Sequence, residues 1–298
     1  MKNKEFFAKL KICGSMAIFG SIGVFVNYLT LPAGFLVFLR ALIGFLFLLP
    51  IVIIKRKDDS IANIKSNFIY LVASGICLGA NWVLLFEAYR YASVSIATLC
   101  YYLAPVFIVL CSPFVLKEKL TLQKCLGVFL ALFGMVFISG VLDGSVQSSV
   151  VGIIFGVCAA VLYATVVLIN KKIKNVSAYN KTAFQFGISI IVTLIYSLFT
   201  EKIDVSMFDT RSIIFILILG IIHTGLSYVL YFSAVCDVKA HTAAVLSYID
   251  PIISIVLAVF ILKEGLSVYE IIGAILILLG AFVVENKFRL IKERKKEL

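Results

Sequence analysis

Ten apolar runs, each close to the length of a membrane-spanning helix, constrain this chain more than any other feature. A helix needs about 20 mostly apolar residues to cross the hydrocarbon core of a bilayer. The runs are apolar on all sides and lack the alternation of transmembrane β-strands, which excludes a membrane barrel. A hydrophobic fraction of 62% with only 14% charged residues likewise excludes an ordinary soluble chain. The sequence therefore predicts an all-α integral membrane protein with ten transmembrane helices, at 12–31, 33–54, 68–89, 93–116, 122–139, 150–170, 183–199, 212–235, 240–262 and 267–285.

The basic residues are distributed unevenly between the connections. If the N-terminus is cytoplasmic, 22 of the 27 lysines and arginines fall on the cytoplasmic side, four fall outside, and one, Arg40, lies within a span. The positive-inside rule therefore predicts a multi-pass protein of the plasma membrane with both termini cytoplasmic. Because the positive charge sits in short loops and in the tail 287–298, it indicates contact with lipid headgroups and not with nucleic acid.

The two halves of the chain repeat each other at an offset of about 146 residues. Proline, glycine and glutamate match as well as leucine, so shared hydrophobicity does not explain the similarity. We expect a tandem duplication of a five-helix unit, over 1–140 and 150–286, followed by the basic tail. The clearest matches pair GANWVLLFEA (79–88) with GLSYVLYFSA (225–234), CYYLAP (100–105) with LSYIDP (246–251), and FVLKEKL (114–120) with FILKEGL (260–266).

An odd number of helices per repeat has a topological consequence. Each helix of the second half must enter the membrane from the side opposite to its counterpart in the first half. Inverted-topology repeats of this kind are typical of secondary transporters, because two half-equivalent arrangements provide the inward-open and outward-open states. The predicted fold is therefore two inverted five-helix repeats, and the predicted function is transport.

The repeated motifs also resemble a known family. Each half has an alanine-rich fourth helix with a proline (ATLCYYLAPVF, AAVLSYIDPII), a short turn with glutamate (LKEKLT, LKEGLS) and a glycine-spaced fifth helix (GVFLALFG, GAILILLG). This pattern resembles EamA-type members of the drug/metabolite transporter superfamily. The resemblance implies a ten-helix carrier with a central cavity that exports amino acids or related metabolites. One departure is Phe19-Gly20, where many members have Trp-Gly.

Four ionisable residues within the spans are candidates for function, because a charge there is costly unless it faces a cavity or a partner: Arg40, Glu87, His223 and Asp250. Asp250 directly precedes Pro251, whose missing N–H opens the helix backbone, and is predicted to be the coupling carboxyl. Hydrogen bonding to a neighbouring helix is the alternative role. Glu87 is either a second cavity carboxylate or an interfacial group beside Arg90, and His223 is either a proton relay or a helix contact.

Arg40 has two interpretations. It either pairs with Glu87 as a structural ion pair or holds a substrate carboxylate in a bidentate fork. We adopt the second hypothesis, with Asp250 or Glu87 taking the substrate ammonium.

Aromatic residues form a second group of candidates, on the four helices interrupted by glycine or proline. Trp82 and Tyr228 are equivalent under the repeat, as are Tyr102 and Tyr248. Such rings can line a cavity and stack on planar or cationic groups. The remaining predicted substrate-binding residues are Asn81 and Tyr101, and the predicted hinges are Gly79, Pro105, Gly225 and Pro251.

The sequence thus favours a secondary carrier of a small metabolite, an amino acid or related compound, working by alternating access with export as the default direction. No ATP-binding loop is present, so gradients must supply the energy, and protons are the candidate coupling ion. A proton-coupled carrier of quaternary amines is the alternative. An intramembrane enzyme is the remote alternative, since HExxH, GxSxG and GxGD motifs are missing. The seven cysteines form no CxxC pair, and neither a metal nor a cofactor is expected.

Overall fold

The computed structural model describes residues 2–54, 61–117, 121–138, 150–204, 207–234, 237–238, 246–247 and 249–285, and every regular element among them is a helix. Tyr248 and the basic tail 287–298 lie outside the described residues. The helices are α1 (Lys2–Gly20), α2 (Ile22–Asn27), α3 (Ala33–Ile54), α4 (Ile61–Ser66), α5 (Phe68–Tyr91), α6 (Val94–Tyr101), α7 (Ala104–Leu116), α8 (Leu122–Ile138), α9 (Val150–Lys172), α10 (Ala178–Thr200), α11 (Thr210–Ile218), the π-helix η3 (Leu219–Leu226), α12 (Ser227–Ala234), α14 (Ile249–Ile261) and α15 (Val268–Glu285).

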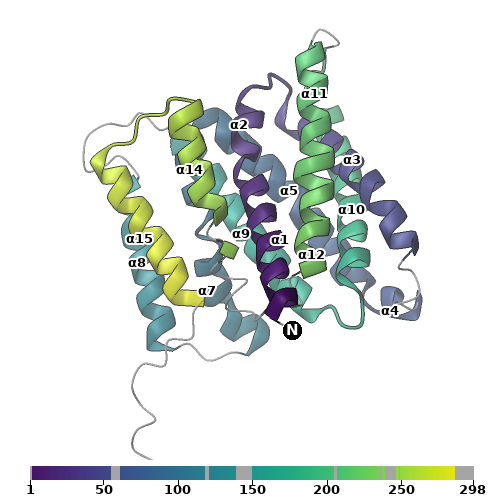
Figure 1. Cartoon of the computed structure of the whole chain (residues 1–298), viewed down its shortest axis with the longest axis horizontal. Coiled ribbons are helices and arrows are strands. Elements are labelled where there is room, and N and C mark those ends of the chain that lie inside the picture. Colours follow the sequence, from purple (N-terminus) through teal and green to yellow (C-terminus); the bar gives the residue numbers. More distant parts are fainter. Residues whose placement is uncertain are drawn as a thin grey trace, which may run out of the picture.

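Seven helical stretches among these residues are long and apolar enough to cross a membrane. Three further apolar helices are shorter, at Cys125–Gly134, Ile249–Ile261 and Val268–Gly280. The all-helical, multi-pass prediction is confirmed, while the count of ten crossings remains a prediction. The long helices run roughly parallel, and the N-terminus and the end of α15 lie at the same end of the bundle (Figure 1).

Local sequence signals set several helix ends. The hydroxyl of Ser93 accepts a hydrogen bond from the Ile96 amide at 3.2 Å, and Asp209 accepts one from the Ser212 amide at 2.7 Å, as expected of N-cap residues. The hydrogen bonds from Ser212 also lower the pKa of Asp209. At helix C-termini, Lys117 after α7 and Lys263 after α14 both have φ of 57°, a left-handed conformation that ends a helix. These two lysines are equivalent under the sequence repeat.

The two halves pack against each other through their last helices. α8 and α15 lie side by side at one edge of the bundle (Figure 1). The interface is built on small residues: a Cβ placed on Gly134 would lie 2.7 Å from the Gly273 carbonyl oxygen, and one on Gly280 would lie 2.6 Å from the Ala131 amide nitrogen. Without a hydrophobic driving force in lipid, such close backbone approach is a main source of helix–helix stability.

Gly134→Ala should therefore lower the free energy of unfolding by about 1–3 kcal/mol, because the added methyl group overlaps backbone atoms of α15 that cannot rotate away. The matched control is Gly14→Ala in α1, where an added Cβ meets nothing within 4 Å. Thermal unfolding of the two purified variants checks this expectation. A melting temperature that falls equally in both, or in neither, would contradict the close-packing account.

Candidate functional site

A buried arginine of the first half contacts the second half of the chain. Arg40 is on α3, seven residues or about 10 Å from the helix start, and is 3% exposed. Its Nε donates a hydrogen bond to Thr224 Oγ1 at 2.9 Å, and the Thr224 hydroxyl donates to the Leu219 carbonyl at 2.8 Å. Leu219 and Thr224 both belong to η3, so the five-residue spacing of the π-helix positions the threonine toward α3. π-helical turns occur frequently at functional sites.

Glycines allow α3 to approach η3 closely enough for this contact. A Cβ on Gly44 would collide with Thr224, and a Cβ on Gly225 would lie 2.5 Å from the ring of Phe47. Gly225, predicted as a hinge, is therefore also a packing position. Gly79, its repeat equivalent, lies against Ser189 of α10, where a Cβ would be 3.2 Å from the Ser189 Cα.

Aromatic rings cover the guanidinium. The Arg40 Cζ lies 4.4 Å from the ring centre of Trp82 and 5.3 Å from that of Phe86, both on α5. Cation–π contacts of this kind contribute about 2 kcal/mol when desolvated. Trp82 packs on Phe186 at 5.4 Å, and Phe186 packs on Tyr228 at 5.2 Å. Trp82 and Tyr228, predicted as a symmetry-related pair, therefore belong to one aromatic wall beside Arg40.

The Phe19-Gly20 pair extends this wall. The Phe19 ring meets the Tyr228 ring edge-to-face at 5.3 Å, so an aromatic contact is made from this position without tryptophan. A Cβ on Gly20 would collide with the Asp250 backbone carbonyl and lie 2.9 Å from the Ile253 Cβ. α1 and α14 therefore approach closely at the residue predicted to couple transport.

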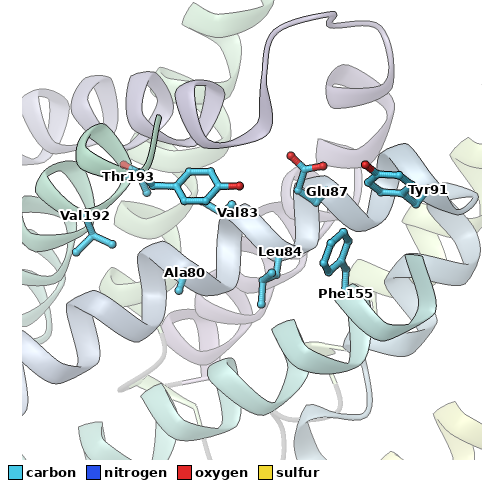
Figure 2. Close-up of a pocket in the computed structure, with 9 residues that line it drawn as sticks. Ala80, Val83, Leu84, Glu87, Tyr91, Phe155, Val192 and Thr193 are labelled. Atoms are coloured by element: carbon cyan, nitrogen blue, oxygen red, sulfur yellow. The ribbon is translucent and has the colours of Figure 1, made fainter. Parts of the chain in front are cut away.

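Glu87 is separated from Arg40 by the body of α5. Five residues divide Trp82 from Glu87, which places them about 140° apart around the helix. Glu87 Oε1 lies 3.8 Å from Arg90 Nη1, and none of the ion pairs between described residues involves Arg40. The structure thus does not bring Arg40 and Glu87 together. Glu87 instead lines a groove of about 400 Å³ between α5, α9 and α10. Figure 2 shows its side chain on α5, between Val83 and Tyr91.

Asn81 and Tyr101 form a buried tie between three helices. Asn81 is fully buried, and its Nδ2 donates to the Ala159 carbonyl of α9 at 2.6 Å. The Tyr101 hydroxyl at the end of α6 donates to Asn81 Oδ1 at 3.4 Å. Both residues lie near the aromatic wall, but the Asn81 side chain is occupied by protein partners. A substrate that bound to Asn81 would have to replace one of these two hydrogen bonds, and the longer one, from Tyr101, is the weaker.

Asp250 and Tyr102 meet where two interrupted helices cross. α6 ends at Tyr101 and α7 begins at Ala104, with Pro105 in its first turn. α14 begins at Ile249, so Asp250 and Pro251 lie in its first turn. The Tyr102 hydroxyl donates a hydrogen bond to the Ser247 carbonyl at 3.4 Å, and the Asp250 carboxyl lies close to that hydroxyl.

A second contact fixes the same crossing. Thr98 of α6 and Ser254 of α14 are hydrogen-bonded at 3.0 Å, and both are buried. The two halves of the chain thus contribute polar side chains to one interface inside the bundle. Interrupted helices at such an interface are typical of transporter binding sites. Tyr248, the repeat equivalent of Tyr102, falls outside the described residues.

His223 is held from both ring nitrogens. Its Nε2 lies 2.9 Å from Ser21 Oγ, and its Nδ1 lies 3.2 Å from the Ile218 carbonyl oxygen. The ring also packs on Phe25 at 4.9 Å. Through these contacts His223 joins η3 to α2 and to the junction between α1 and α2. A role as a proton relay stays a prediction.

Two residues that sequence reasoning missed join distant parts of the chain. Thr224, the partner of Arg40, gives no signal in the sequence because its repeat equivalent is Leu78. Glu264 belongs to the repeated turn LKEGLS, but that motif does not predict its partners. It accepts hydrogen bonds at the start of α6, from the Val94 amide at 2.7 Å, the Ser95 amide at 3.1 Å and the Ser95 hydroxyl at 2.8 Å.

Comparison with known proteins gives a consistent result over nearly the whole chain. The sequence profile of the EamA-like transporter family matches residues 7–140 and 150–285. The uncharacterized transporter YxxF of Bacillus subtilis (strain 168) is 33% identical over 276 residues, which are 92% of this chain and 88% of the relative. An uncharacterized transporter of Clostridium kluyveri is 28% identical over 261 residues, 86% of this chain and 84% of the relative.

The fold is also found in a solved structure. A protein crystal structure with 20% sequence identity superposes with a TM-score of 0.66 and covers 93% of this chain and 95% of its own. At that identity the likeness concerns the fold alone. The family match falls on the two halves that the sequence repeat separates, and it confirms the resemblance seen in the motifs. The chain belongs to the EamA-like transporter family and is a multi-pass membrane transporter.

Proposed function

We propose that this protein is a secondary active transporter that carries a small zwitterionic metabolite of the amino-acid class across the plasma membrane, in the direction of export. The observation that carries the proposal is the state of Arg40. Among the described residues, its guanidinium has one hydrogen bond, two aromatic faces and no carboxylate partner. A buried charge without a counter-ion is costly, and a substrate carboxylate bound by the guanidinium in a fork would offset that cost.

Asp250 and its neighbours supply the second pole of the proposed site. Tyr101 and Tyr89 lie within electrostatic range of Arg40 and of Asp250, so these two rings lie between the charged groups. An α-amino acid carries opposite charges and suits a carrier with opposite poles. A quaternary amine would leave Arg40 without a counter-ion, and this weighs against the organic-cation alternative.

Alternating access is proposed from the repeat. Under the offset of 146 residues, α8 and α15 begin at equivalent positions, α7 and α14 are each 13 residues long, and Lys117 and Lys263 share the same left-handed conformation. These correspondences support ten crossings in two inverted repeats. In this proposal the Glu264 contact with α6 closes the end of the bundle opposite the N-terminus and opens when the carrier changes state.

The proposed topology predicts opposite labelling of two equivalent, exposed lysines. In a cysteine-less background, Lys263→Cys should react with an impermeant thiol reagent on intact cells, and Lys117→Cys should react only after permeabilisation. The pair is matched, since both backbones have φ of 57° and both side chains are exposed. Labelling of both from the same side would overturn the inverted arrangement.

The substrate class is tested by ligand-dependent stabilisation of the purified protein. A ligand that binds only the folded state at 100 times its Kd raises the free energy of unfolding by about 2.7 kcal/mol. We expect neutral amino acids to raise the melting temperature, and expect their amides and quaternary amines to raise it far less. Stabilisation by quaternary amines alone would reject the proposal in favour of the organic-cation carrier.

A further inference from the structure

The groove around Glu87 lies apart from the region of Arg40 and Asp250. α5 forms its floor with Ala80, Val83, Leu84, Glu87 and Tyr91, and Phe155 of α9 and Val192, Thr193 and Tyr196 of α10 form its walls. This stripe of α5 is on the helix face opposite Trp82. The neighbouring side chains of Ile154, Ile191 and Ile195 are 53%, 55% and 51% exposed, which indicates that the groove opens toward lipid.

The length of the groove matches one leaflet of the bilayer. Ala80 is at the middle of α5 and Tyr91 is its last residue, so the stripe spans 11 residues, or about 16 Å. Half of a hydrocarbon core of about 30 Å is about 15 Å. An acyl chain lying along the stripe would therefore reach from the bilayer centre to the interface.

Polarity changes along the groove in the same direction. Ala80 and Val192 lie toward one end, beside Thr193, whose hydroxyl is bonded within α10 to the Ser189 carbonyl at 2.7 Å. The Glu87 carboxylate and the Tyr91 hydroxyl lie at the other end (Figure 2). The Glu87 side chain is 16% exposed, and its Oε1 lies 3.8 Å from Arg90 Nη1, which is a long ion-pair contact. Arg90 in turn donates a hydrogen bond to the Leu31 carbonyl, which directs it away toward the connection before α3.

Charge then selects among lipid headgroups. Glu87 is the acidic residue that lines this end of the groove. Glu201 lies within electrostatic range of it and adds negative charge nearby, while its two oxygens accept hydrogen bonds from the Gly34 and Phe35 amides of α3 at 2.7 and 2.8 Å. An anionic headgroup would be repelled there, whereas a primary ammonium can pair with Glu87 Oε2. We propose that the groove is a binding site for a single aminophospholipid, with an acyl chain on Ala80 and Leu84 and the headgroup amine on Glu87.

Trp82 is the single tryptophan of the chain, which allows a site-specific fluorescence test. In a Trp82→Phe background, Phe155→Trp places an indole in the groove, five residues from the start of α9. Ile195→Trp is the control, on the exposed rim and five residues from the end of α10. Each variant is reconstituted with brominated phosphatidylethanolamine or brominated phosphatidylglycerol at equal mole fraction, since bromine quenches an indole that it contacts.

We expect the Phe155→Trp fluorescence to be quenched several-fold more effectively by the ethanolamine lipid, and expect Glu87→Gln to remove this preference. The Ile195→Trp control should show no preference. Equal quenching by both lipids in the groove, or a preference that survives Glu87→Gln, would overturn the proposal. If the tryptophan variants do not assemble, native mass spectrometry of the unaltered chain from an equimolar mixture of the two lipids decides: retention of one ethanolamine lipid supports the site, and retention of neither or of the glycerol lipid rejects it.

Discussion

Arg40→Gln is expected to abolish recognition of the substrate carboxylate while leaving the fold intact. Removing one partner of a buried, hydrogen-bonded charge pair costs about 2–5 kcal/mol, so the affinity for a neutral amino acid should fall by about 30-fold or more. The amide of the same amino acid lacks the carboxylate and should lose little affinity. Equilibrium binding of the labelled amino acid and its amide to purified protein measures both effects.

Arg211→Gln is the matched control for this prediction. Arg211 also stacks on aromatic rings, with its Cζ 4.8 Å from the ring centre of Tyr28 and 5.3 Å from that of Phe215, but it is exposed in the first turn of α11. Its loss should leave binding unchanged. Unaltered binding of the amino acid by Arg40→Gln would remove Arg40 from the substrate site.

Asp250→Asn should abolish accumulation driven by a pH gradient while counterflow persists in part. The amide imitates the protonated acid, so the carrier can still bind and exchange substrate, but it can no longer take up and release a proton. The hydrogen bond from Tyr102 to the Ser247 carbonyl does not involve the Asp250 side chain, so the substitution leaves it in place. Uptake into proteoliposomes, with and without an imposed pH gradient, separates the two activities.

Asp237→Asn provides the comparison for the coupling carboxyl. Asp237 forms an ion pair with Lys4 at 2.8 Å outside the crossing of α6 and α14. Surface pairs of this kind contribute about 0–1 kcal/mol, so driven accumulation should be unaffected. If Asp250→Asn still concentrates substrate against a pH gradient, Asp250 is not the proton carrier.

The sequence predicted the helices well because each span must be apolar over its own length, whatever it packs against. Hydropathy depends on about 20 consecutive residues, and the prolines at 105 and 251 mark the first turns of α7 and α14 without any knowledge of tertiary contacts. The repeat likewise predicted equivalent glycines, and Gly134 and Gly280 do face the opposing helix. What the repeat did not predict is the left-handed backbone at Lys117 and Lys263, since lysine has no preference for that conformation.

The site was predicted less completely because its partners are far apart in the sequence. Arg40 stands out as the single basic residue within a span, yet the hydrogen bond to Thr224 joins residues 184 positions apart. Helix geometry alone predicts that Glu87 and Trp82 lie on different faces of α5. Which helices pack on each of those faces depends on tertiary contacts, and the sequence does not predict them. The contact of Glu264 with the start of α6 similarly joins the two halves, and no local rule predicts it.

Counterflow in proteoliposomes tests the central claim most directly, because it requires substrate recognition and alternating access but no ion gradient. Vesicles containing the purified protein are loaded with an unlabelled neutral amino acid and diluted into a trace of the same labelled compound. Labelled amino acid should accumulate transiently above its equilibrium level, and Arg40→Gln should remove this overshoot. An overshoot with quaternary amines and none with any amino acid would contradict the account.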